Sequence, residues 1–356
     1  MSYITFLAGL CFLLVGAEML VRGASRLAAR LGISPLVIGL TVVAFGTSSP
    51  ELAVSIKAAF ADQAGIAMGN VVGSNLFNIL FILGLSAMVT PLVVAQKLIR
   101  FDIPLMVALS AALLLLVLDG QLSRLDGVLL AAGLVAYLAF LLYQSARSRA
   151  EASAGSDAMP AARDAWGVNL LLVAAGLVLL VLGSRWLVEG AVTFASFLGI
   201  SEQVIGLTII AAGTSLPEVM TSLIAALRGE RDIAVGNVVG SNVFNILGVL
   251  GLSSLLAPSG LMVTPAMISF DIPVMLAVAA ACLPICFTGG SIERWEGALL
   301  LGYYIAYTLY LILAATQHDA LAGFTGVMLY FALPLTVLTL AVLSLQEQKR
   351  RSGRLR

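Results

Sequence analysis

The sequence predicts an all-α integral membrane protein made of two inverted five-helix repeats, with an extra eleventh transmembrane helix at the C-terminus. Three observations lead to this prediction: an apolar composition, a series of long apolar runs, and an internal duplication. Of the 356 residues, 60% are hydrophobic and only 11% are charged, and the mean hydropathy is +1.06. Because soluble domains carry about 25% charged residues, the chain is expected to lie in a lipid bilayer.

Apolar runs of about 18 residues or more are candidates for membrane-spanning helices. Eleven such runs are found, near residues 4–21, 35–60, 66–90, 101–118, 124–143, 167–188, 202–227, 233–257, 270–288, 297–315 and 322–345. The first run lacks the basic start and the small-residue cleavage site of a signal peptide. It is therefore expected to remain as a helix.

The first ten runs form two related sets of five. Residues 15–91 match residues 182–258 at a constant offset of 167, and 36 of the 61 positions from Leu31 to Pro91 are identical. Such self-similarity indicates a duplicated fold. The predicted units are a first repeat, 1–143 with its motif at 39–91; a cytoplasmic linker, 144–166; a second repeat, 167–315 with its motif at 206–258; and an eleventh helix with a basic cytoplasmic tail, 316–356.

Five helices in each repeat would make the two copies cross the membrane in opposite directions. The basic residues indicate the same arrangement, because cytoplasmic loops carry an excess of Lys and Arg. With the N-terminus outside, sixteen of the 19 basic residues fall inside, and the three outside are Lys57, Arg124 and Arg185. The C-terminus is then cytoplasmic. Inverted repeats of this kind are typical of secondary transporters.

Two apolar runs contain related turns, GTSSPE at 46–51 and GTSLPE at 213–218. A carboxylate in a membrane span is costly, and a proline there frees a backbone carbonyl, so the repetition of both indicates function. Thr47 and Glu51 are four residues apart and share one helix face. Pro50 cannot donate to the Gly46 carbonyl, so the turn is expected to open and offer backbone oxygens. The second turn repeats the pattern with Thr214, Glu218, Pro217 and Gly213.

The next apolar run of each repeat contains the motif GNVVGSN, at 69–75 and at 236–242. Its polar residues form a stripe with a four-residue spacing, made of Asn70, Ser74 and Asn78 in one copy and Asn237, Ser241 and Asn245 in the other. The GxxxG spacing of its glycines predicts close packing of neighbouring helices. Amide and hydroxyl oxygens at this depth can complete a cation site without adding charge.

A site with only oxygen ligands, and without His or Cys, suits a hard cation such as calcium, magnesium or sodium. One calcium ion balances two ionised carboxylates, and calcium prefers about six to eight oxygen ligands. No cofactor is expected, because the ions are cargo. The expected partners are calcium ions, sodium ions and the bilayer; a zero net charge gives no indication of nucleic-acid binding, and no protein partner is indicated.

Asp102 and Asp271 each precede an Ile-Pro pair at the start of an apolar run. This position predicts a helix N-cap with an early proline rather than an ion ligand. Cys11, Cys282 and Cys286 lie in apolar runs without the spacing of a zinc site, so they are expected to act as small apolar side chains.

At the GTSxPE and GNVVGSN motifs the sequence resembles the calcium/cation antiporter superfamily, specifically the prokaryotic sodium/calcium exchangers. The resemblance covers the first ten predicted helices. It implies that the protein lies in the inner membrane of a bacterial or archaeal cell. It implies that Glu51 and Glu218 bind both calcium and sodium, and that the carbonyls of Thr47 and Thr214 complete the calcium site. It also implies sodium sites at Ala44, Ser48 and Ser241, and at Ala211, Ser215 and Ser74, with Asn78 and Asn245 between them.

The expected function is therefore exchange of calcium for sodium by alternating access, with calcium leaving the cell as sodium enters, and not an enzyme activity. The resemblance implies that the first and sixth helices slide across the others. Some relatives carry Asp where this chain has Asn245, which disfavours potassium co-transport here. Two alternatives remain: calcium/proton exchange through the same glutamates, and a passive cation channel.

Overall fold

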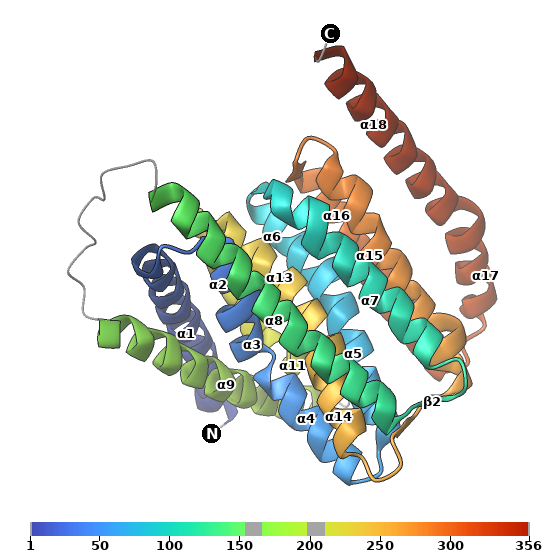
Figure 1. Cartoon of the computed structure of the whole chain (residues 1–356). Helices are drawn as coiled ribbons and strands as arrows, with labels where there is room; N and C mark the ends of the chain where they lie inside the picture. Colours follow the sequence, from blue (N-terminus) through green and yellow to red (C-terminus); the bar gives the residue numbers. More distant parts are fainter. Residues whose placement is uncertain (1, 154–165, 198–210, 355–356) are drawn as a thin grey trace.

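Long apolar helices make up most of the computed structural model, which describes residues 2–153, 166–197 and 211–354 (Figure 1). In this described part nine helices are long and apolar enough to cross a membrane, and a bent pair raises the number to ten. The predicted all-α membrane fold is confirmed to that extent. A count of eleven spans is not established, because residues 202–210 of the predicted seventh span lie outside the described residues. The same holds for most of the predicted linker, 154–165.

The first half of the chain contains five membrane-length helical rods, several of which include short π-helical segments labelled η. Its elements are α1 (Ser2–Leu31), α2 (Pro35–Ile38), η1 (Gly39–Val43), α3 (Ala44–Thr47), α4 (Ser49–Phe60), α5 (Ala64–Leu76), η2 (Phe77–Leu83), α6 (Gly84–Val89), β1 (Leu92–Val93), η3 (Leu98–Asp102), α7 (Ile103–Leu116), β2 (Gln121–Leu122) and α8 (Arg124–Ser153).

The second half repeats most of this order. Its elements are α9 (Trp166–Phe197), α11 (Ala211–Gly213), α12 (Leu216–Leu227), α13 (Arg231–Phe244), η5 (Asn245–Leu250), α14 (Gly251–Leu256), β3 (Leu261–Met262), η6 (Met267–Asp271), α15 (Ile272–Phe287), β4 (Ser291–Ile292) and α16 (Arg294–Ala315). A last rod follows, made of α17 (Ala320–Val327), η7 (Met328–Ala332) and α18 (Leu333–Arg354).

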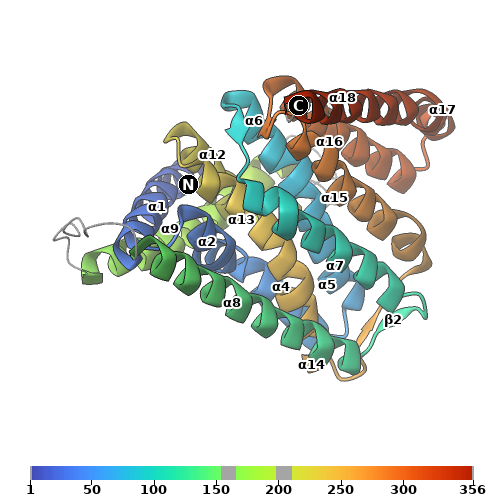
Figure 2. The same ribbon diagram turned by 45° about the horizontal axis from the view of Figure 1, so that its top comes forward.

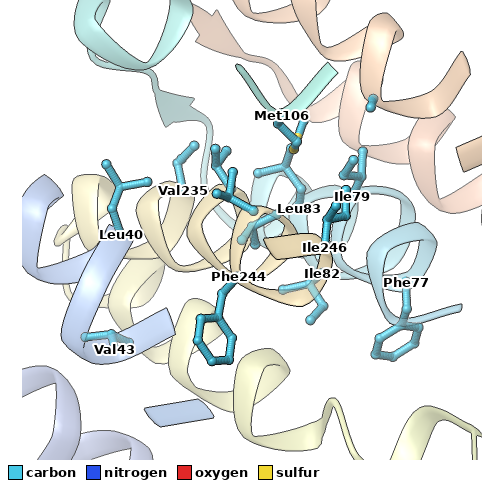
Figure 3. Close-up of a cluster of buried hydrophobic side chains, with 14 of the residues drawn as sticks. Leu40, Val43, Phe77, Ile79, Ile82, Leu83, Met106, Val235, Phe244 and Ile246 are labelled. Atoms are coloured by element: carbon cyan, nitrogen blue, oxygen red, sulfur yellow. The ribbon is translucent and has the colours of Figure 1, made fainter. Parts of the chain in front are cut away.

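The rods α5–α6 and α13–α14 form the centre of the molecule. The rod at 231–256 is buried along its most apolar window, whereas most residues of the outer rod at 294–315 are only partly buried. Figure 3 shows buried side chains around this centre, among them Phe77 of η2, Phe244 of α13 and Met106 of α7. An apolar centre surrounded by apolar outer faces is the expected pattern for a bundle in lipid, since both environments exclude water.

Four very short strands connect the loops of the two halves. Strand β1 pairs antiparallel with β4, and β2 pairs antiparallel with β3. The loops after residues 90 and 288 therefore meet at one place, and the loops after residues 117 and 257 meet at another. Because one strand precedes and another follows each of α7 and α15, the pairings join the two halves at both ends of these helices.

A glycine seam joins α1 to α9, and both views show these helices side by side (Figure 2). Gly9 and Gly16 of α1 face Gly183 and Gly176 of α9. A Cβ atom added at Gly176 would lie 2.7 Å from the backbone nitrogen of Leu20 and 2.8 Å from the carbonyl oxygen of Gly16. The two backbones are therefore in direct contact, as small residues permit in membranes.

Polar contacts connect α1 to the second half near the end of α12. Glu18 pairs with Arg22 one turn away at 2.6 Å, and also with Arg228. Ser25 donates to the Glu230 carboxylate at 2.7 Å. These contacts place α1 against α12 as well as α9.

The prediction that Asp102 and Asp271 cap helices is wrong. Both have helical backbone angles, because η3 and η6 begin four residues earlier, and neither side chain makes a capping bond. Instead, Tyr137 of α8 donates to Asp102 at 3.1 Å, and Tyr307 of α16 donates to Asp271 at 2.8 Å. Each carboxylate thus links its helix to the following one.

We expect Tyr137→Phe to destabilise the protein, because Asp102 is fully buried and its other carboxylate oxygen already lacks a hydrogen-bond partner. Loss of a bond to a buried polar group costs about 1–3 kcal/mol. Thermal unfolding in detergent measures the change, with Tyr143→Phe, on an exposed face of the same helix, as the control. Equal unfolding temperatures for the two variants would contradict the prediction.

Candidate ion-binding site

Two broken turns position the candidate carboxylates. Ser48 leaves the helical conformation with φ −81° and ψ 7°, and α3 and α4 meet there at a bend of 45°. Ser215 has nearly the same angles, φ −88° and ψ 6°. A proline is the second residue of the helix that follows each break, and the next residue, Glu51 or Glu218, lies in the first helical turn. Unpaired backbone N–H groups at such a helix start favour a negative charge.

The two carboxylates are buried and held by serines of the opposite half. Glu51 is 0% exposed and Glu218 is 1% exposed. Ser215 donates to Glu51 Oε1 at 2.8 Å, and Ser48 donates to Glu218 Oε1 at 3.0 Å. Ser74 also contacts Glu51 Oε1 at 3.5 Å. The sequence-predicted residues of both halves are therefore brought together in one site.

Several buried oxygens in this region have no hydrogen-bond partner among the described residues. They are Glu51 Oε2, Glu218 Oε2, Ser241 Oγ, Asn78 Oδ1 and Asn245 Oδ1. An unpartnered buried polar group is costly, so several of them in the repeated motifs need an explanation. Carboxylate, amide and hydroxyl oxygens are the ligands that hard cations prefer, and they fit this donor set.

The side chains of Thr47, Thr214, Asn70 and Asn237 connect helices. Thr47 donates to Asn237 Oδ1 at 3.1 Å, and Thr214 contacts Asn70 Oδ1 at 3.5 Å. The Asn70 amide nitrogen donates to the Glu51 carbonyl at 3.1 Å. The side-chain oxygens of Asn70 and Asn237 therefore each accept one protein hydrogen bond, and their role as cation ligands stays a prediction. The carbonyls of Thr47 and Thr214 remain predicted ligands.

The carbonyls expected to be freed at the two prolines have found other donors. The Gly46 carbonyl accepts a hydrogen bond from Ser49 Oγ at 2.7 Å, and the Gly213 carbonyl accepts one from Ser184 Oγ of α9. The turns do break at Ser48 and Ser215, but each of these two carbonyls already accepts one hydrogen bond, and its role as an ion ligand stays a prediction.

The residues implied in sodium sites differ in their surroundings. The Ala44 carbonyl accepts the backbone N–H of Ser48 at 3.0 Å. Ser74 accepts a hydrogen bond from Ser215 at 3.1 Å, whereas the hydroxyl of the equivalent Ser241 has no hydrogen-bond partner in the described part of the chain. The side chain of Ala211 lies outside the described residues. Their roles in binding sodium remain predictions.

Close packing of the second-half motif confirms the GxxxG interpretation there. A Cβ atom added at Gly240 would lie 2.8 Å from the Cβ of Ala44 and 2.8 Å from the Cα of Leu40. Helix α13 therefore rests directly on the backbone of η1 and α3, beside the break at Ser48. Small residues at this crossing allow the site helices to approach one another.

Sequence reasoning missed a second set of residues next to the site. Asn75 and Asn242 make amide contacts between the halves, and Ser55 and Ser222 each accept a hydrogen bond from Asn70 or Asn237, at 2.9 Å in both cases. The asparagines belong to the repeated GNVVGSN motif, which is a signal for them. Ser55 and Ser222 recur at the same offset of 167, four residues after the glutamates.

The arrangement can neutralise and hold a cation but offers little for covalent chemistry. In the described residues no group of three or more His, Cys, Asp and Glu side chains is placed to hold a metal. A bound ion would thus depend on two carboxylates supplemented by neutral oxygens. Such a set suits reversible binding of a hard cation rather than a resident transition metal.

Comparisons with known proteins agree with this chemistry. A family model described as sodium/calcium exchanger protein matches residues 1–144 and 168–313. The sodium/calcium exchanger MaX1 of Methanosarcina acetivorans is 33% identical over 347 residues, covering 87% of this chain and 98% of its own. The inner membrane protein YrbG of Escherichia coli is 39% identical over 306 residues, covering 85% and 94% respectively.

A solved structure of the sodium-calcium exchanger NCX_Mj, soaked with zero Na⁺ and Ca²⁺, has a similar fold. Its TM-score is 0.75 at 33% sequence identity, and the match covers 87% of this chain and 98% of that chain. A second structure of that exchanger, soaked with Na⁺ and Sr²⁺, gives a TM-score of 0.74. The relatives named as exchangers are transporters and not enzymes.

Proposed function

The chain belongs to the sodium/calcium exchanger protein family, and from this premise we propose that it is a secondary active antiporter that exchanges calcium for sodium. It would act by alternating access, with sodium entry driving calcium out of the cell. The proposed location is the inner membrane of a bacterial or archaeal cell.

One observation carries the proposal: two buried glutamates from opposite halves face one site, and each has a carboxylate oxygen that no described residue hydrogen-bonds. In the described residues no Lys, Arg or His forms a salt bridge with either of them. Two ionised carboxylates attract one calcium ion or two sodium ions with equal total charge. The same site can therefore bind either kind of cargo, as exchange requires.

The cost of changing access without a bound ion explains why ions would exchange instead of leaking. Moving two unpaired carboxylates through a closed, dehydrated state would cost several kcal/mol for each charge. A bound cation removes that cost, so the change of access is expected only in the loaded protein. We propose Glu51 and Glu218 as ligands of both ions, with Thr47 and Thr214 for calcium.

The proposed topology is two inverted repeats with the N-terminus outside and the C-terminus in the cytoplasm. Two observations support it. Strands β1–β4 and β2–β3 each pair the loop before the fourth helix of one half with the loop after the fourth helix of the other half, as expected when the two halves cross the membrane in opposite directions. The basic residues are also concentrated in the loops assigned to the cytoplasm.

Calcium uptake into proteoliposomes tests the function. We expect uptake when the vesicles are loaded with sodium, and none when they are loaded with potassium or choline. Uptake that requires an imposed proton gradient instead of sodium would replace the proposal with calcium/proton exchange. Uptake without any counter-ion would indicate a channel.

A further inference from the structure

Asn75 and Asn242 are buried at the crossing of the two central rods, beside the candidate ion site. They are 2% and 1% exposed. Each directly follows a serine of the site, Ser74 or Ser241, in the repeated motif. As a consequence their side chains point away from the serines and contact the other half.

The partners of Asn75 determine which way its amide points. Its Nδ2 contacts the Asn242 carbonyl oxygen at 3.4 Å and Met275 Sδ at 3.7 Å. A backbone carbonyl and a thioether only accept hydrogen bonds, so the NH₂ group must face them. The Asn75 oxygen then faces Asn245, whose Nδ2 donates to it at 3.1 Å.

Asn242 is oriented in an equivalent way. Its Nδ2 donates to Met106 Sδ at 3.4 Å, which again only accepts. Its oxygen therefore faces Asn78, whose Nδ2 donates to it at 3.3 Å. Met106 is one of the buried side chains in the cluster of Figure 3.

These contacts use the NH₂ groups of Asn78 and Asn245 but not their side-chain oxygens. The Oδ1 atoms of Asn78 and Asn245 are buried and accept no hydrogen bond from the described residues. Asn78 lies one helical turn from Ser74, and Asn245 one turn from Ser241, so both share the face of the site. An amide oxygen in this place attracts a cation, whereas an amide NH₂ group would repel it.

We propose that Asn75 and Asn242 are positioning residues that hold the amides of Asn245 and Asn78 with their oxygens toward the transported cation. Met106 sets the orientation of the Asn242 and Asn78 amides. The backbone carbonyl of Asn242 sets that of the Asn75 and Asn245 amides. This inference rests on the proposed function. It assigns a role in cation affinity to residues that would not touch the ion.

An isosteric change at Met106 tests the orientation directly. Met106→Leu keeps the volume but removes the one acceptor that the described residues offer to Asn242 Nδ2. Without this hydrogen bond the Asn242 amide can turn over and present its NH₂ group to Asn78. We therefore expect the KM for calcium to rise about threefold. Met275→Leu is the matched control, since Asn75 keeps the Asn242 carbonyl as an acceptor. Equal KM values for both variants would overturn the proposal.

A second test separates orientation from packing. We expect Asn75→Ala to raise the calcium KM about tenfold, with the maximal rate changed less than twofold. In an Asn245→Asp background the same change should have almost no effect, because a carboxylate has two equivalent oxygens and needs no orientation. In an Asn78→Asp background the tenfold rise should persist. Equal rises in all three backgrounds would mean that Asn75 only fills space.

Calcium binding is measured in addition to transport, as calcium-dependent thermal stabilisation of the purified protein in detergent. The apparent Kd should follow the same pattern as the KM. If the unmodified protein shows no sodium-dependent calcium uptake, the proposed function fails. If it does, and the variants keep its calcium affinity, only the positioning role fails.

Discussion

Glu51→Gln is expected to reduce calcium transport by about 100-fold or more, since losing a partner from a buried, charge-paired site costs about 2–5 kcal/mol. Gln has the shape of Glu and can still accept the hydrogen bond from Ser215 through its oxygen. Its NH₂ group, however, replaces the unpartnered Oε2 atom. The site then loses one negative charge and presents a donor to a cation.

Glu218→Gln should have an equally large effect, because Ser48 holds Glu218 as Ser215 holds Glu51. The measurement is initial calcium uptake by equal amounts of folded protein in sodium-loaded proteoliposomes. Glu296→Gln is the matched control: it is a buried glutamate whose side chain caps α16 by accepting from the Glu293 backbone N–H at 2.8 Å, and Gln can cap in the same way. Normal transport by Glu51→Gln would show that the Glu51 carboxylate is not an ion ligand.

Gly176→Leu is expected to abolish transport by forcing α9 away from α1. A Cβ atom at this position already meets backbone atoms at 2.7 and 2.8 Å, and backbone cannot move aside as a flexible side chain can. Overpacking of this kind costs about 1–3 kcal/mol or more. If α1 and α9 move during exchange, the seam makes them move together, so loss of the seam would affect the motion as well as the stability.

The variant is compared with Gly302→Leu on α16, where an added Cβ meets nothing within 4 Å. The two changes add the same apolar side chain to a membrane helix. We expect a lower unfolding temperature and no sodium-dependent uptake for Gly176→Leu only. Gly176→Ala should lie between that variant and the unmodified protein. A Gly176→Leu protein that folds and transports normally would show that the backbones need not touch.

Most of the fold could be predicted because membrane helices follow from composition. A helix in lipid must satisfy its own backbone, so apolar length alone indicates it. The duplicated motifs also identified Glu51 and Glu218 as a pair of functional residues, since a carboxylate inside a membrane span is costly and marks a functional site. The break at Ser48 could be expected from Pro50, which removes a backbone donor.

What the sequence by itself determined, then, is which residues carry charge and polarity inside the membrane and on which face of a helix they lie. The tertiary structure alone decided how the halves interlock: Ser215 holds Glu51 from 164 residues away, and Tyr137 rather than a backbone N–H binds Asp102. It also decided that the Gly46 carbonyl accepts a hydrogen bond from Ser49, and that Met106 orients the amides of Asn242 and Asn78. The physical reason is that local patterns depend on neighbours three or four residues apart, whereas hydrogen-bond partners depend on how distant backbones approach and which way each amide turns.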